Sequence, residues 1–316
     1  MTDLVTFGET MLRLSTPPGE RIETAPALDV HVGGAESNVA AAAAQLGVDA
    51  AWLSKLPESS PARRITDFLR QRGVAPRVAR GKGRVGTYYL ERSGEPRGAQ
   101  VRYNRQLAPI RSVTPDELDF EVVDGAEVFF TSGITPALSA TARATTRTLL
   151  ERARDADVRT GFDVNYRAKL WTPEEARDGV GDLLPLVDLL VVAERDAATV
   201  LGRDGKPEMI AAGLADEYDI ETVIVTRGEQ GALAYRDGTV HERESVPTET
   251  HDPVGSGDAF VGGFLAKQLQ GGTVPEALAW GVAAASLTRT VKGDVAVLDR
   301  AEVEDVLEGS EDGIAR

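Results

Sequence analysis

The segment His251-Asp-Pro-Val-Gly-Ser-Gly-Asp-Ala-Phe260 joins a tight glycine turn to a predicted helix. Gly255, Ser256 and Gly257 bend the chain and expose backbone N–H groups where this helix begins. Such N–H groups, together with the positive end of the helix dipole, form a binding site for an anion. Asp258 lies beside them and can accept a proton from a hydroxyl group. A plain turn, with Asp258 as a helix cap, explains the same residues equally well.

On either side of this segment, short apolar runs alternate with longer stretches of helical character. Such alternation is typical of a parallel sheet with helices on both faces, so we expect an α/β fold with three layers, α/β/α, and a mostly parallel central sheet. The predicted strands are 4–7, 127–131, 160–164, 189–192 and 222–226, and the predicted helices are 35–46, 138–154, 257–270 and 275–291.

Two early segments, residues 10–34 and 84–106, lack helical spacing and contain β-type runs such as 85–90 and 100–103. We expect them to form a small β-sheet, here called the lid. The lid would project from a main domain made of the remaining residues. A small sheet with an open edge and an uncovered face gains from pairing with a second copy, so the lid is also the predicted contact of a homo-oligomer. The predicted main domain comprises residues 1–9, 35–83 and 107–316.

The composition excludes several classes of protein. The chain has 316 residues, no cysteine and a formal net charge of -15, and 42% of its residues are hydrophobic. The hydrophobic fraction is sufficient for a core, and the absence of cysteine excludes disulfides and thiolate metal sites. The negative charge disfavours nucleic acid as a partner. The sequence has no apolar run long enough for a membrane helix and no signal-peptide pattern at its start, so we expect a cytoplasmic protein.

Lysine is scarce, with only six of the 35 basic residues. An acidic, lysine-poor surface suits a salt-rich cytoplasm, where screening removes the self-repulsion of the carboxylates, and this favours a halophile. A GC-rich genome, with its arginine codons, is the alternative explanation.

Several other sequence patterns resemble nucleotide or metal sites but do not indicate one here. Gly81-Lys-Gly-Arg-Val-Gly86 matches G-x-G-x-x-G, but it leads into a β-type run rather than a helix, which disfavours a nicotinamide site. The chain has no P-loop motif, and His31, His241 and His251 share no metal-ligand spacing.

Three further polar loops flank the predicted strands or begin a helix. Residues 163–167 follow one strand, residues 225–233 leave another with two turn glycines, and residues 33–38 begin the first long helix. Ligands of open α/β sheets bind beyond the carboxyl ends of the strands, so these loops and the 251–260 segment are expected to form one site.

The glycine pair Gly33-Gly34 and the segment 251–258 resemble the two signatures of the ribokinase-like (PfkB) carbohydrate kinases, and the resemblance covers essentially the whole chain. Within this family the chain is most similar to 2-keto-3-deoxygluconate (KDG) kinases, particularly the haloarchaeal type. The resemblance implies a ribokinase-like fold and transfer of phosphate from ATP to the 6-hydroxyl of KDG, for an Entner–Doudoroff route. A fructokinase or ketohexokinase of the family, or a non-catalytic sugar or nucleotide sensor, are the alternatives. The supporting segments are 7–14, 102–105, 132–135 and 163–171.

The resemblance also assigns roles to individual residues. It implies that Asp258 is the catalytic base and that the N–H groups of Gly255, Ser256 and Gly257 form the anion hole. The implied sugar-acid residues are Gly34, Asn38, Tyr88, Tyr103, Arg105, Ile134 and Arg167, and the implied nucleotide residues are Asn165, Thr226, Gly228 and Gly231. Ala284, Ala285 and Thr288 would line the adenine pocket or pack in the core.

The chain departs from the family pattern at several positions. Pro253 replaces the usual threonine, and the magnesium motif N-x-x-E reads Ala193-Glu-Arg-Asp196, so Asp196 and Glu194 are the candidates to hold Mg²⁺ through water. The resemblance further permits a K⁺ ion beside Asp252. Arg13 stands where many relatives have an acid, and we expect it to join Arg105 and Arg167 as a cation in the site.

Overall fold

The computed structural model describes residues 2–93 and 96–309. A nine-stranded sheet forms its centre, in the order β13-β12-β11-β10-β9-β8-β1-β4-β5. All neighbouring strands pair in parallel except for two pairings, β11 with β12 and β12 with β13, which are antiparallel. The strands are β1 (Leu4–Phe7), β4 (Ala50–Leu56), β5 (Val74–Arg80), β8 (Val128–Ser132), β9 (Arg159–Asp163), β10 (Leu189–Ala193), β11 (Thr222–Thr226), β12 (Ala232–Arg236) and β13 (Thr239–Arg243).

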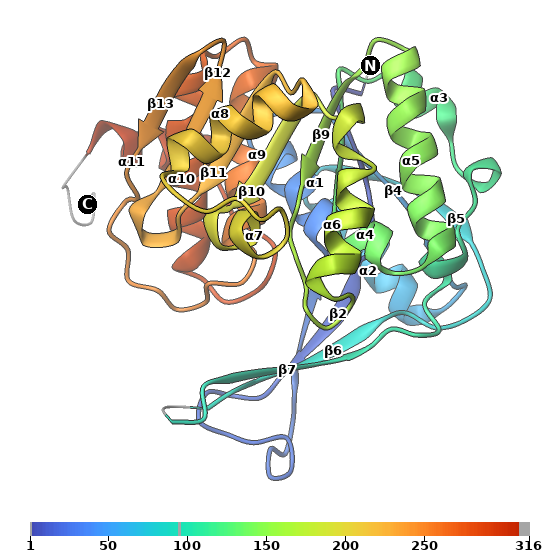
Figure 1. Cartoon of the computed structure of the whole chain (residues 1–316). Coiled ribbons are helices and arrows are strands. Elements are labelled where there is room, and N and C mark those ends of the chain that lie inside the picture. Colours follow the sequence, from blue (N-terminus) through green and yellow to red (C-terminus); the bar gives the residue numbers. More distant parts are fainter. Residues whose placement is uncertain (1, 94–95, 310–316) are drawn as a thin grey trace.

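Helices cover both faces of this sheet (Figure 1). Successive residues of a strand point to opposite faces, and accordingly Phe130 enters one hydrophobic core while Phe129 enters the other. One face is covered by α1 (Ala35–Gln45), α2 (Ser60–Gln71), α9 (Ser256–Leu269), α10 (Val274–Arg289) and α11 (Arg300–Glu308). The other is covered by α3 (Phe120–Asp124), α5 (Ala140–Asp155), α6 (Pro173–Gly181), α7 (Glu194–Thr199) and α8 (Pro207–Tyr218), while the short α4 (Ile134–Ala137) follows β8.

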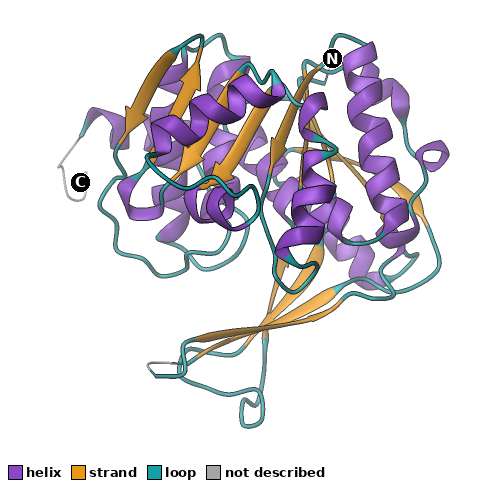
Figure 2. Cartoon of the chain, viewed as in Figure 1, coloured by secondary structure: helices purple, strands orange, loops and turns teal. Residues whose placement is uncertain are grey.

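A second sheet stands apart from the first and projects from the body of the molecule (Figure 2). Its order is β3-β2-β6-β7, with β2 and β6 parallel and the two outer pairings antiparallel. Its strands are β2 (Met11–Ser15), β3 (Asp29–Gly33), β6 (Thr87–Arg92) and β7 (Ala99–Asn104). The predicted fold class, a three-layer α/β domain with a separate small β-sheet, is confirmed.

The run of alanines in α1 has a specific packing role. Ala42 lies against Gly262 of α9, where an added Cβ would come within 2.5 Å of the Ala42 Cβ. Only small residues permit this close approach of two helices. One turn earlier, the same two helices carry Asn38 and Asp258, so the tight packing brings these two side chains within reach of each other.

The G-x-G-x-x-G pattern at 81–86 lies in the loop between β5 and β6, and no helix follows it. Among the residues that the structure describes, no helix is both long enough and apolar enough to cross a membrane.

Candidate active site

A cavity of about 840 Å³ lies between the lid and the carboxyl ends of the parallel strands. Met11, Tyr88 and Tyr103 line it from the lid, and Asp163 and Thr226 line it from the ends of β9 and β11. This is the position at which an open α/β sheet binds its ligands.

Seventeen of the residues predicted for catalysis, substrate, nucleotide and metal lie along this one cavity, although their positions span most of the sequence; Arg13, Ala284 and Thr288 do not line it. The seventeen residues are Gly34, Asn38, Tyr88, Tyr103, Arg105, Ile134, Asn165, Arg167, Glu194, Asp196, Thr226, Gly228, Gly231, Gly255, Ser256, Gly257 and Asp258.

Asp258, in the first turn of α9, is held by Asn38. The Asn38 Nδ2 donates to Oδ2 of Asp258 at 2.7 Å, and the backbone N–H of Gly34 donates to the Asn38 Oδ1 at 3.2 Å. The second bond fixes which way the amide of Asn38 points. The carboxylate of Asp258 is therefore oriented by a chain of two hydrogen bonds that starts at the beginning of α1.

The surroundings of Asp258 favour a base that works near neutral pH. Burial raises the pKa of Asp258 to about 7, and the charges of Glu36 and Asp294 add to this effect. The hydrogen bond from Asn38 and the charge of Arg167 act in the opposite direction. A carboxylate with a pKa close to the working pH is well suited to general-base catalysis.

The glycine turn before Asp258 adopts a backbone that other residues resist. Gly255 has φ of 81°, and a Cβ there would lie 1.8 Å from the backbone oxygen of Asp294. Pro253 retains a structural role because its carbonyl accepts a hydrogen bond from the Ser256 hydroxyl at 2.9 Å. Gly255, Ser256 and Gly257 line the cavity beside Asp258 at the start of α9, where a helix has free N–H groups, although the N–H of Ser256 also donates to the Pro253 carbonyl at 3.4 Å.

The lid side of the cavity contains a buried ion pair that sequence reasoning missed. The Nε of Arg105 donates to Oε2 of Glu9 at 2.7 Å, and its Nη2 contacts the same oxygen. Oε1 of Glu9 is buried without a hydrogen-bond partner among the described residues. Arg105 also lies over the Tyr103 ring, 5.2 Å from its centre. Arg105 is thus a directed donor rather than a free cation. Glu9 follows a strand and a glycine, which is the signal that marks the other loops of the site.

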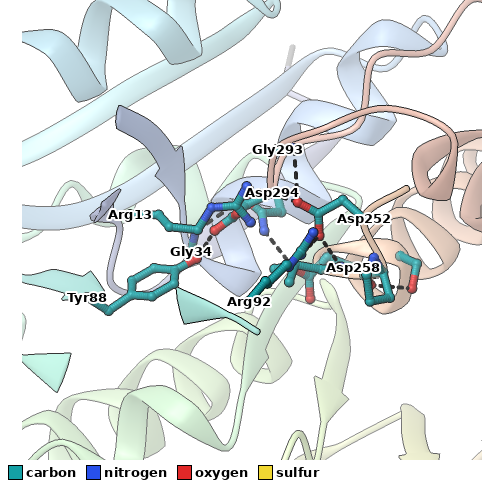
Figure 3. A network of polar contacts seen from close by, with 12 residues as sticks. Arg13, Gly34, Tyr88, Arg92, Asp252, Asp258, Gly293 and Asp294 are labelled. Atoms are coloured by element: carbon teal, nitrogen blue, oxygen red, sulfur yellow. Dashed lines mark hydrogen bonds and ion pairs between the residues drawn. The ribbon is translucent and has the colours of Figure 1, made fainter. Parts of the chain in front are cut away.

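The prediction that Arg13 adds a cation to the site is wrong. Arg13 lies on the lid strand β2, is buried, does not line the cavity, and pairs with Asp252 at 2.9 Å and with Asp294 at 2.5 Å. Figure 3 shows this network, in which Arg92 also contacts Asp252 and the Tyr88 hydroxyl donates to Asp294. Two carboxylates neutralise the guanidinium, because a buried charge without partners is costly.

The same network also holds the loop that precedes the anion hole, through Asp252. The carboxylate of Asp252 accepts hydrogen bonds from Arg13, Arg92 and the N–H of Val254. The K⁺ ion beside Asp252 stays a prediction. Asp294 itself lines the cavity and was not predicted from the sequence.

The acidic side chains at the ends of β9 and β10 suit a cation. Burial raises the pKa of Asp163 to about 8, and the charges of Asp258 and Asp196 contribute. Asp196 is buried and accepts a hydrogen bond from the N–H of Tyr166 at 3.2 Å. Within residues 2–93 and 96–309, no three such side chains are close enough together to ligate one metal ion. Oxygen donors that bind through water fit Mg²⁺, which keeps much of its hydration shell.

The nucleotide side of the cavity is formed by glycine turns and by α10. Gly231 has φ of 84°, and a Cβ there would lie 2.1 Å from the Arg243 carbonyl oxygen. Ala285 lines the cavity, whereas Ala284 and Thr288 are buried in the core, where the Thr288 hydroxyl donates to the Ala284 carbonyl. The cavity also contains Ser245 and Arg289, which sequence reasoning missed.

Comparison with known proteins identifies the family. The model of the pfkB family carbohydrate kinases matches residues 1–300. The chain is 53% identical over 315 residues to 2-dehydro-3-deoxygalactonokinase of Haloferax volcanii, with 99% of each protein covered.

Solved structures agree with this match. The 2-dehydro-3-deoxygluconokinase of Thermotoga maritima superposes with a TM-score of 0.92 at 34% identity, covering 98% of both chains. A structure named ribokinase II of E. coli, in complex with ATP and Mg²⁺, has the same fold, with a TM-score of 0.89 at 22% identity, covering 98% of this chain and 100% of the other. The family match spans nearly the whole chain and includes both glycine segments of the cavity, so the chain belongs to the PfkB family and is a carbohydrate kinase.

Proposed function

We propose that this chain is an ATP-dependent kinase of 2-keto-3-deoxy sugar acids that phosphorylates KDG at its 6-hydroxyl, giving 2-keto-3-deoxy-6-phosphogluconate. One observation carries the proposal: Asp258, held by Asn38 beside a helix N-terminus, shares its cavity with Arg105 and Arg167. The names of two relatives support the substrate class, since they are kinases of the gluconate and galactonate forms of this sugar acid.

In the proposed reaction, Asp258 accepts the proton of the substrate 6-hydroxyl. The freed oxygen forms a bond to the γ-phosphorus of ATP while the bond between that phosphorus and the bridging oxygen breaks, and ADP leaves. The N–H groups of Gly255, Ser256 and Gly257 stabilise the negative charge of the phosphoryl group in transfer. Mg²⁺, when bound, neutralises the phosphates, and Asp196 and Glu194 would hold it through water.

The positive charges of the cavity suit the carboxylate of a sugar acid. Arg167 donates to the backbone carbonyl of Tyr166 at 3.1 Å and forms no ion pair with a carboxylate of the described residues. Arg105, held by Glu9 through Nε and Nη2, retains its Nη1 for a ligand. Guanidinium groups bind carboxylates through paired hydrogen bonds, which a neutral sugar lacks. This difference favours a sugar acid over fructose.

A substrate panel tests the proposal. The purified protein is assayed with ATP, Mg²⁺ and varied KCl against KDG, its C4 epimer 2-keto-3-deoxygalactonate, fructose and ribose, and ³¹P NMR assigns the phosphorylated position. We expect kcat/KM to be at least about tenfold higher for the keto acids, since one charged hydrogen bond contributes about 1.5–3 kcal/mol. Higher kcat/KM for fructose would support a fructokinase instead. Asp258→Asn is the control for the mechanism, and undiminished phosphate transfer by this variant would exclude Asp258 as the base.

A further inference from the structure

Among the residues that the structure describes, five arginine side chains line the cavity, and they differ in whether the chain already supplies a hydrogen-bond acceptor. Arg105, Arg167, Arg195 and Arg227 each donate to a carboxylate or a backbone carbonyl. Arg289 makes no side-chain hydrogen bond or ion pair with any residue that the structure describes, and its Nε is buried. This is unexpected in a chain with 50 acidic and 35 basic residues, where carboxylates are plentiful.

The position of Arg289 is fixed by its backbone. It is the last residue of α10, and its carbonyl oxygen accepts hydrogen bonds from the N–H groups of His251 and Asp252, at 2.8 and 3.2 Å. These two residues lead into the turn at Gly255. Ala285, one turn earlier on α10, lines the same cavity. The backbone of Arg289 therefore ties the end of α10 to the loop that precedes the anion hole, and its side chain lines the cavity beside that loop.

Partial burial of a guanidinium that has no acceptor costs free energy, and a bound anion would offset this cost. The Arg289 side chain is therefore a candidate binding residue for an anion. The reaction has two anionic substrates. In the proposed binding mode the sugar acid lies against Arg105 and Tyr103 of the lid. The helix that ends at Arg289 instead packs against the segment that carries Ser245, because the Ser286 hydroxyl of α10 donates to the Val246 carbonyl. Guanidinium groups bind phosphate oxygens through paired hydrogen bonds. We propose that Arg289 binds the phosphate chain of the nucleotide; this inference rests on the proposed function.

Calorimetric titration of ADP and of adenosine separates this role from a structural one. Arg289→Gln removes the charge, Arg289→Lys keeps it, and Arg300→Gln, at an exposed arginine of α11, is the matched control. We expect Arg289→Gln to bind ADP about 10- to 100-fold more weakly than the unmodified protein. Adenosine, which has no phosphate, should bind within about twofold of the unmodified protein, because the Arg289 contact contributes nothing to it. Arg289→Lys should recover part of the ADP affinity, and Arg300→Gln should change neither ligand.

The outcomes separate the two proposals. Failure of the unmodified protein to bind ADP would refute the proposed function itself. Normal ADP binding by Arg289→Gln would refute only the role of Arg289. Equal losses for ADP and adenosine would indicate a structural role and would also refute it, as would a rise in KM for the sugar acid with no change for ATP. If Arg289→Gln does not fold, Arg289→Lys is compared alone, and a loss confined to ADP is the supporting result.

Discussion

Replacing Asn38 by alanine is expected to raise the pKa of Asp258 and to move the acidic limb of the pH–rate profile upward. The Asn38 amide donates to the carboxylate at 2.7 Å, and this bond stabilises the ionised form. A hydrogen bond to a charged group contributes about 1.5–3 kcal/mol, and one pKa unit corresponds to about 1.4 kcal/mol. The midpoint of the profile should therefore rise by about 1–2 pH units.

The measurement is kcat/KM for the sugar acid from about pH 5 to about pH 10, because this ratio reports the ionisation of the free enzyme. With an unmodified midpoint near 7, a rise of this size lowers kcat/KM at neutral pH by about 5- to 50-fold and leaves the alkaline plateau less affected. Gln45→Ala is the matched control, since it removes an amide at the far end of the same helix.

One result would refute this reasoning. If Asn38→Ala lowers kcat/KM equally at every pH and its midpoint does not move, Asn38 acts on the substrate and not on Asp258. A midpoint that moves downward would contradict the hydrogen-bond geometry itself.

Three further predictions follow from the packing and charge of the site. The pKa of Asp258 is about 7 in the folded protein, above its ordinary value of 3.8, so the free energy of unfolding falls as the pH rises between these two values. Asp258→Asn should therefore raise Tm more at about pH 8 than at about pH 5. An equal rise at the two pH values in scanning fluorimetry would contradict this reasoning. Arg105→Met removes the ion-pair partner of the buried Glu9 carboxyl, so it should lower the free energy of unfolding in urea by about 2–5 kcal/mol and raise KM for the sugar acid. Adding Glu9→Gln should restore stability alone, and restored KM would mean that Arg105 does not bind substrate. Gly262→Ala should lower the free energy of unfolding by about 1–3 kcal/mol and lower kcat, because the added Cβ collides with Ala42. Adding Ala42→Gly should recover part of the lost stability. An unchanged free energy of unfolding in Gly262→Ala would contradict the close packing of α1 and α9.

The strands and helices that flank the site were predictable because their signals are local. The runs at 4–7 and 222–226 match β1 and β11, and the glycine turn before 258 begins α9 as expected. The final hairpin of the main sheet was not predicted, since β13 is polar and mostly exposed. Its turn, Asp237-Gly238 with φ of 50° and 75°, is nevertheless a recognisable hairpin signal.

The partners of charged side chains were not predictable. Arg13 and Asp252 are 239 positions apart, and nothing in the order of residues indicates that they meet. The same holds for Arg105 and its partner Glu9, which are separated by 96 positions. Composition indicates how much charge a chain carries, whereas only the packed structure shows which charges neutralise each other and which, like Arg289, remain available.

The ion pairs at the base of the lid have a consequence for a protein in concentrated salt. The Debye length falls from about 8 Å at 0.15 M to about 3 Å at 1 M, so exposed charges lose their influence while buried pairs lose little. Arg13 is 2% exposed and Asp252 is 1% exposed. Rising salt would therefore screen the repulsion between the acidic side chains of the surface without weakening the buried ion pairs between the lid and the 251–258 loop. Salt should therefore change the electrostatics of the exposed surface much more than those of the buried ion pairs that connect the lid to the 251–258 loop.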